Sequence, residues 1–290
     1  MGFPFLIGLL LGGLSVFYVF LAVAAFSQEF ALLINASVVA VLKDVVGPVS
    51  AGFGGAIAGA YSAYYLQRKN EEHKERRVDH LVVHGAAVQL SEMLKDLLAL
   101  KKFNICPFMN SNLRFLGIPK SPISTTIVGV VEPKVIDVLL SRGSGAALSA
   151  VLMAASSYRV CCQNLSSRNK ELDDYNALMQ KAGLSLRTDL TICDILPAVG
   201  AGRLLGLYDL CEDALVRLDE AIANLQGAIE SLSEVVESQF RKEGSKNIKF
   251  TFEGGEEYFT KISDPFISKK QFEELIKECE GGGERVMSWS

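Results

Sequence analysis

The chain has 290 residues, of which 49% are hydrophobic, and a formal net charge of -4. Its mean hydropathy of +0.26 is high for a soluble protein. The apolar excess lies near the N-terminus, because no charged residue precedes Glu29 and none lies between Asp44 and Arg68. A wholly soluble protein is therefore not expected. The remainder has ordinary soluble composition and is long enough to bury one sizeable core or two small ones.

Charge is distributed unevenly along the soluble part. Residues 97–170 are strongly basic, whereas residues 171–290 are strongly acidic. This asymmetry predicts either charge pairing within the chain or between subunits, or a polyanion site on the basic part.

Residues 3–26 form the first uncharged run. About 20 apolar residues suffice to cross the hydrocarbon core of a bilayer, so this run is expected to be a membrane span. A cleaved signal peptide is the alternative, since residues 22–24 (AVA) resemble a cleavage site. The run lacks the positively charged start that signal peptides have, which favours a span.

Residues 45–67 form the second uncharged run, and Arg68 and Lys69 follow directly. Basic residues beside a span remain on the cytoplasmic side. We therefore expect a protein of the cell inner membrane whose N-terminus and C-terminal domain are both cytosolic. The apolar segment 30–42 between the runs is too short to span, and it is expected to lie in the outer interface or to re-enter the membrane.

Small residues line one side of the second predicted span. They recur at spacings of three and four, which places Gly52, Gly55, Gly59 and Ala63 on one helix face. Small residues allow helices to approach closely within lipid. The face is expected to pack either against the first span of the same chain or against other subunits around an axis.

The fold class predicted for the whole chain is mainly α, with a two-span transmembrane hairpin and a cytosolic helical bundle. The expected parts are a transmembrane region (1–67), a charged stalk helix (68–102), a helical domain (103–246) and a tail (247–290). A near-heptad apolar stripe predicts a long helix over residues 198–242, opened by Pro197. Alternating residues at 247–252 and 257–262 predict a small β-hairpin, followed by a short helix.

The cysteines and the histidines are the residues that could form disulfides, bind a metal or respond to pH. The six cysteines include no CxxC pair, which fits free thiols in a reducing compartment. The three histidines, His73, His80 and His84, share one stripe of the stalk. They could be metal ligands, pH-sensitive groups in an oligomer, or solvated polar side chains. We expect solvated side chains and no metal site.

The segment 101–122 combines cations with aromatic rings. The residues expected to bind a ligand are Lys101, Lys102, Phe108, Arg114, Phe115 and Lys120. Cations that hold phosphates beside rings that stack on bases suit a nucleotide or a single-stranded oligonucleotide. The same composition suits a loop on anionic lipid headgroups, or a loop paired with the acidic C-terminal part.

The chain contains no GxSxG motif of α/β-hydrolases, no HExxH motif of metalloproteases and no GxxxxGK[ST] motif of P-loop proteins. We therefore expect no enzymatic activity, no catalytic residue and no cofactor. The two-span anchor, the charged stalk and the motif-free helical domain resemble the two-span membrane effectors of bacterial anti-phage systems. These include the Hailong type, whose effector is similar to a ligand-gated membrane channel. The resemblance rests on this layout and on residues 52–77.

The resemblance implies a homo-oligomeric channel or membrane-disrupting effector, controlled by an oligonucleotide that a partner enzyme makes. A tetramer is the first expectation for its subunit number. It would place ligand contacts on segment 101–122. The alternative is a membrane-tethered scaffold or sensor that recruits a cytosolic partner and conducts nothing. Since two spans of one chain cannot enclose a water path, conduction requires several chains in the lipid bilayer.

Overall fold

The computed structural model describes residues 36–41, 44–45, 47–122, 131–185, 190–240 and 256–281, with Gly12, Gly13, Phe17 and Val19. These residues form helices and connecting loops, with no strand among them. The predicted mainly α fold is confirmed for this part of the chain. The chain divides into two compact units, Met1–Glu75 and Arg76–Ser290. Their boundary falls inside the predicted stalk.

The helix α4 (Gly47–Leu100) runs through this boundary. Its residues from 58 to 78 are all exposed, and Arg68 pairs with Glu72 one turn later at 3.2 Å. From Val83 onward one face is buried, including Leu90 and Leu94. The change from all-polar to amphipathic sequence therefore marks the point where α4 enters a protein core.

The membrane predictions meet a mixed outcome. The first predicted span lies largely outside the described residues, and α3 (Ala36–Val41) is a short helix within the predicted outer segment. The second predicted span is helical from Gly47, but among the described helices only α7 (Gly145–Lys181) is long and apolar enough to cross a membrane. The two-span hairpin is thus not confirmed. Glycines and tyrosines lower the mean hydropathy of residues 47–67.

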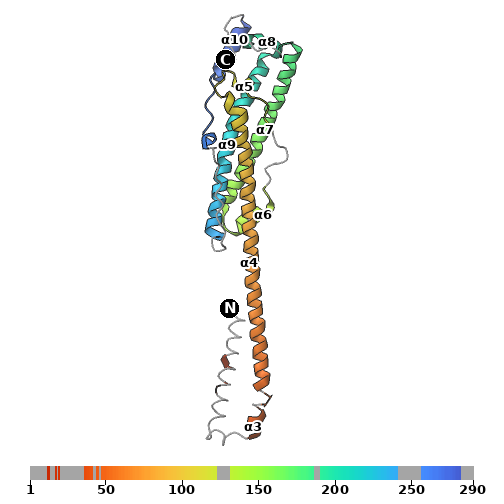
Figure 1. Cartoon of the computed structure of the whole chain (residues 1–290), viewed down its shortest axis with the longest axis vertical. Coiled ribbons are helices and arrows are strands. Elements are labelled where there is room, and N and C mark those ends of the chain that lie inside the picture. Colours follow the sequence, from red (N-terminus) through yellow and green to blue (C-terminus); the bar gives the residue numbers. More distant parts are fainter. Residues whose placement is uncertain are drawn as a thin grey trace. The chain divides into compact units, whose positions relative to one another are not determined.

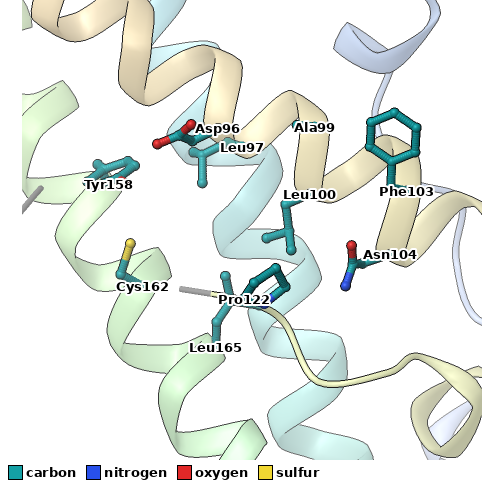
Figure 2. Close-up of a pocket in the computed structure, with 10 residues that line it drawn as sticks. All are labelled: Asp96, Leu97, Ala99, Leu100, Phe103, Asn104, Pro122, Tyr158, Cys162 and Leu165. Atoms are coloured by element: carbon teal, nitrogen blue, oxygen red, sulfur yellow. The ribbon is translucent and has the colours of Figure 1, made fainter. Parts of the chain in front are cut away.

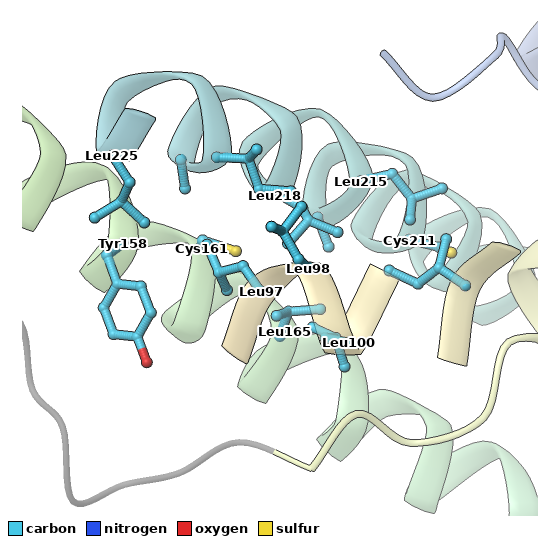
Figure 3. Close-up of a cluster of buried hydrophobic side chains, with 14 of the residues drawn as sticks. Leu97, Leu98, Leu100, Tyr158, Cys161, Leu165, Cys211, Leu215, Leu218 and Leu225 are labelled. Atoms are coloured by element: carbon cyan, nitrogen blue, oxygen red, sulfur yellow. The ribbon is translucent and has the colours of Figure 1, made fainter. Parts of the chain in front are cut away.

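Three long helices build the core of the second unit. The C-terminal part of α4, α7 and α9 (Ala201–Phe240) run alongside one another (Figure 1). Their leucines and small residues meet along the shared axis, as Figure 3 shows for Leu97 of α4, Leu165 of α7 and Leu218 of α9. Since α7 contributes buried residues along its length to this core, we describe it as a bundle helix.

The predicted long helix is confirmed with a different start. Pro197 lies inside α8 (Ile192–Val199), and the chain turns at Gly200 before α9 begins at Ala201. Gly200 has a φ of 85°, a conformation that favours glycine. This residue therefore separates two helices where the apolar periodicity suggested one.

Shorter elements cover the two ends of the bundle. The helix α6 (Pro133–Ser141) lies at one end, and α5 (Arg114–Gly117), α8 and α10 (Lys269–Glu280) gather at the other (Figure 1). Capping boxes fix two of these helix starts: Thr191 with Asp194, and Ser268 with Gln271. Each satisfies backbone N–H groups that a helix start leaves without partners.

The predicted β-hairpin is wrong for its second strand. Residues 256–259 form a 3-10 turn, η5 (Glu256–Phe259), and no strand follows in the described tail. The first strand falls outside the described residues. The backbone groups of this segment form hydrogen bonds with side chains of the bundle and not with a neighbouring strand. The Thr260 carbonyl accepts from Lys101, and the Ile262 N–H donates to Asp219, each at 2.6 Å.

The expectation that all cysteines are free is also wrong. Cys193 of α8 and Cys279 of α10 form a disulfide across a Cα–Cα distance of 5.1 Å. They are 86 residues apart in the sequence, so only the folded arrangement brings them together. Four cysteines remain free: Cys106, Cys161, Cys162 and Cys211.

Candidate functional site

The basic segment folds as a series of short turns directly after α4. A π-helical turn, η2 (Lys101–Ile105), is followed by a 3-10 turn, η3 (Cys106–Phe108), and by α5. Pro107 stands at the start of η3, where its missing N–H costs little. Two cations of this segment, Lys101 and Arg114, contact both α9 and the tail.

Lys101 lies in the interior, with 3% of its surface exposed. Its Nζ lies 2.6 Å from the Asp219 carboxylate of α9 and donates to the Thr260 carbonyl at 2.6 Å. The same carboxylate accepts the Ile262 N–H. One ion pair thus joins η2, α9 and the tail.

Arg114 makes a similar connection at α5. Its guanidinium forms a two-pronged ion pair with Glu212 of α9, with the Nε–Oε1 bond at 2.9 Å. Its Nη1 donates to the Ser263 carbonyl at 2.8 Å. Arg114 is buried, so Glu212 compensates its charge where water cannot.

Phe115 is part of the core. Its ring meets Tyr208 edge-on at a centroid distance of 5.5 Å and Phe272 at 5.0 Å. The Tyr208 hydroxyl donates to the Ile267 carbonyl at 2.9 Å. With 2% of its surface exposed, Phe115 offers no face on which a base could stack.

The other three predicted ligand residues lie nearer to the surface. Lys102 is exposed and its Nζ lies 5.3 Å from the Tyr258 ring centroid. Phe108 is half-buried against the core, and Lys120 forms an exposed ion pair with Asp173 of α7. The structure therefore divides the six residues into three that are buried and three that an external ligand can reach.

The buried cations bring together the basic and acidic parts of the chain. Asp219 and Glu212 both belong to the acidic part, and each neutralises one cation of the basic segment. This arrangement corresponds to the third alternative that the sequence left open, pairing within the chain. A phosphate would meet Lys101 or Arg114 only if these carboxylates released them.

Arg168 is a functional-looking residue that the sequence did not single out. It is 1% exposed, and its guanidinium donates to the carbonyls of Pro119 at 3.1 Å and Phe115 at 3.3 Å, and to that of Ile118. It holds the end of α5 against α7. Burial raises the pKa of the Cys211 thiol to about 11, and the nearby Arg168 charge opposes that rise. The contacts of Arg168 with carbonyls about 50 residues away set it apart from other arginines, and the sequence carries no signal of them.

Within the described part of the chain, nothing covers the small-residue face of α4. Gly52, Gly55, Gly59 and Ala63 are all exposed. No described atom comes within 4 Å of a Cβ placed on any of the three glycines. Large apolar side chains of the same stretch are exposed too, among them Val49 and Phe53. The face can therefore accept another helix at close range.

One histidine of the stripe is exposed and the other two are half-buried. His73 is exposed, whereas His80 is half-buried, with its ring 5.4 Å from that of Phe240 and 6.1 Å from that of His84. Within the described part of the chain, no three His, Cys, Asp or Glu side chains are grouped so as to hold a metal ion. The packing of His80 against Phe240 gives this residue a structural role.

Comparisons with protein-family models, with curated proteins and with solved structures found no match to this chain. Function must therefore be inferred from the residues and their geometry. The features available are the open glycine face of α4, the basic segment at the end of the same helix, and the surfaces of the bundle.

Proposed function

We propose that the chain is a homo-oligomeric membrane effector, either a channel or a membrane-disrupting assembly, which its helical bundle controls. The observation that carries this proposal is the exposed face of Gly52, Gly55, Gly59 and Ala63. In lipid no hydrophobic force drives helices together, so association depends on close packing, which a face of small residues allows. Several copies of α4 around an axis, with a tetramer as the first expectation, would line a path.

The continuity of α4 supports control by the bundle. The helix starts within the uncharged stretch and ends at Leu100, and Lys101 directly after it is held by Asp219. A change at Lys101 would therefore act on the end of the helix whose first turns form the proposed pore. In this proposal the bundle and the N-terminus are cytosolic and the membrane is the bacterial inner membrane.

The proposed ligand is a nucleotide or an oligonucleotide made by a partner enzyme. Its phosphates would first meet the accessible cations, Lys102 and Lys120. They would then compete with Asp219 and Glu212 for Lys101 and Arg114. Because both buried cations also hold carbonyls of the tail, such an exchange would release residues 260–263 from the bundle. This release would be the signal passed to α4.

A second candidate is a membrane-tethered scaffold or sensor that recruits a cytosolic partner and does not conduct. Exposed apolar side chains on α7 favour it, namely Leu152, Met153 and Val160. These residues are suited to contact with another protein.

Planar-bilayer recordings of the purified full chain test the proposal, together with an oligomer count in detergent by mass photometry. Discrete conductance steps, or dye leakage from liposomes, from an oligomer would support the effector. A monomer, or an oligomer that leaves the bilayer sealed with and without oligonucleotide, would favour the scaffold.

A further inference from the structure

A pocket opens on the bundle between the end of α4, η2 and α7, with a cavity volume of about 490 Å³ (Figure 2). This volume lies in the range of small-molecule sites. None of the cations that pair with α9 lines it, so it is separate from the basic contacts described above.

The walls of the pocket are mostly apolar. Leu97 and Leu100 of α4 and Leu165 of α7 are buried residues that contribute to its lining. Phe103 lies at the edge with 68% of its surface exposed, and its ring centroid is 5.5 Å from the Lys102 Nζ. From this edge the ring can turn to close over a ligand. A ligand with an aliphatic or aromatic body would lose water-exposed apolar surface here, which favours binding.

One end of the pocket is polar. Figure 2 shows the Asp96 carboxylate and the Cys162 sulfur directed toward the region of the Tyr158 side chain. Tyr158 and Cys162 are one turn apart on α7, and each affects the pKa of the other. Asn104 lies away from this end, on the side of Phe103 (Figure 2), and its amide nitrogen donates to the Lys120 carbonyl at 3.3 Å.

The charge at this end is a single negative one. Burial raises the pKa values of both Tyr158 and Cys162, and Asp96 raises them further, so both groups are neutral near pH 7. Asp96 is thus the only charged side chain among the lining residues, and no described cation pairs with it. A phosphate or carboxylate ligand would meet repulsion here, whereas an ammonium group would meet attraction.

We infer that this pocket binds a small amphiphilic cation, with an ammonium group beside Asp96 and an apolar body against Leu97, Leu100 and Leu165. The Phe103 ring covers the body of the ligand from the rim. Such a ligand is chemically opposite to a nucleotide. The pocket therefore adds a second input to the bundle, located at the same end of α4 as Lys101.

Three probes of similar shape and different charge test this inference on the full chain in detergent: 2-phenylethylamine, 2-phenylethanol and 3-phenylpropanoate. Isothermal titration is run with protein-free micelles as the blank. The ammonium is expected to bind on the order of fivefold more tightly than the alcohol, the size of a partly exposed ion pair. The carboxylate is expected to bind most weakly.

Two variants assign the effect to the pocket. Asp96→Asn should remove the preference for the ammonium and leave the alcohol unchanged, whereas Asp137→Asn, at an exposed position on α6, should preserve it. Phe103→Ala should weaken all three probes and leave folding intact, because the ring is exposed. Equal affinity for ammonium and alcohol, a preference that persists in Asp96→Asn, or no binding of 2-phenylethylamine to folded protein would each overturn the inference.

Discussion

Lys101 and Asp219 form a buried ion pair at 2.6 Å that attaches the residue directly after α4 to the middle of α9. The two residues are 118 positions apart, so the sequence alone does not predict that they pair. Both side chains are largely buried. The remaining oxygen of Asp219 accepts the Ile262 N–H, so the carboxylate is shared between a cation and the tail. This contact fixes how the end of α4 is held.

Replacing Asp219 by Asn should destabilise the protein strongly. The amide keeps the shape of the carboxylate but leaves the Lys101 charge buried and uncompensated, which costs about 3–5 kcal/mol. Urea unfolding of the full chain in detergent, followed by circular dichroism, measures the loss. The control is Asp173→Asn, which breaks the exposed pair with Lys120 and should cost less than about 1 kcal/mol. Equal losses in the two variants would contradict the buried role.

The long core helix shows how far the sequence alone can lead. The spacing of leucines and isoleucines predicts α9 because a helix that packs on a core repeats its apolar side every three or four residues. The break at Gly200 leaves no such trace, since Ala198, Val199 and Ala201 continue the apolar run. The strand prediction for residues 257–262 was wrong for another reason. The alternation fits a strand, but Lys101 and Asp219 form hydrogen bonds with backbone groups of this segment.

The sequence indicated which charged residues could interact at the candidate site, but not which of them would be buried. The charge asymmetry indicated that basic and acidic parts could pair, and Lys101 and Arg114 do so. Which cations would be buried depended on the turns η2 and α5, whose short irregular shapes have no periodic signal. Arg168 was missed because its partners are backbone carbonyls, and these look alike at every position of a sequence.

Bulk on the open face of α4 should prevent assembly. Gly55→Leu and Gly59→Leu each place a branched side chain where helices are proposed to meet, and both are expected to reduce the oligomer to monomers. Gly54→Leu is the matched control, because position 54 lies on the opposite side of the helix. Mass photometry in detergent reports the subunit number. Wild-type assembly in both test variants would show that another surface holds the subunits together.

The disulfide between Cys193 and Cys279 should be detectable and stabilising. The full chain, unfolded without reductant and treated with a maleimide of known mass, is expected to react at four of its six cysteines. Cys193→Ala with Cys279→Ala should lower the free energy of unfolding by about 2–4 kcal/mol, since the bond closes a long loop. Six reactive thiols in protein isolated from cells would contradict this prediction, whereas four would conflict with the reducing cytosol in which the proposed topology places the bundle.

Stability should fall at high pH because of buried thiols. The Cys211 thiol has a pKa raised by burial from 9.0 to about 11. Between these values the unfolded chain loses the proton and the folded chain keeps it, so the unfolded state gains by up to about 1.4 kcal/mol per pH unit. The contribution is complete below pH 9 and is lost as the pH rises to 11. Unfolding curves of Cys211→Ala should show a shallower decline than those of wild type, whereas Cys106→Ala, whose thiol is partly exposed, should change the slope less.

The accessible cations of the basic segment should decide whether it binds an anionic ligand. Fluorescence anisotropy of a labelled short oligonucleotide with the full chain in detergent gives the affinity at two salt concentrations. Lys102→Glu with Lys120→Glu is expected to abolish binding, and wild-type binding should weaken with salt by about 0.7 of a log unit in affinity per log unit of salt for each phosphate neutralised. Phe108→Ala should lose about 1–3 kcal/mol if a base stacks on its ring. Lys134→Glu, at an exposed position on α6, is the control for net charge and should retain binding.

The buried cations provide the second half of this test. Lys101→Glu and Arg114→Glu should lower the melting temperature even without ligand, because each places a carboxylate opposite Asp219 or Glu212. Asp173→Asn frees Lys120 from its surface partner, so it should tighten oligonucleotide binding if that lysine contacts a phosphate. If the segment serves only to hold the fold, the buried reversals will change melting while the exposed ones change neither melting nor anisotropy. If it rests on lipid headgroups, the exposed reversals will weaken binding to anionic liposomes, and wild type will give no oligonucleotide signal at low salt.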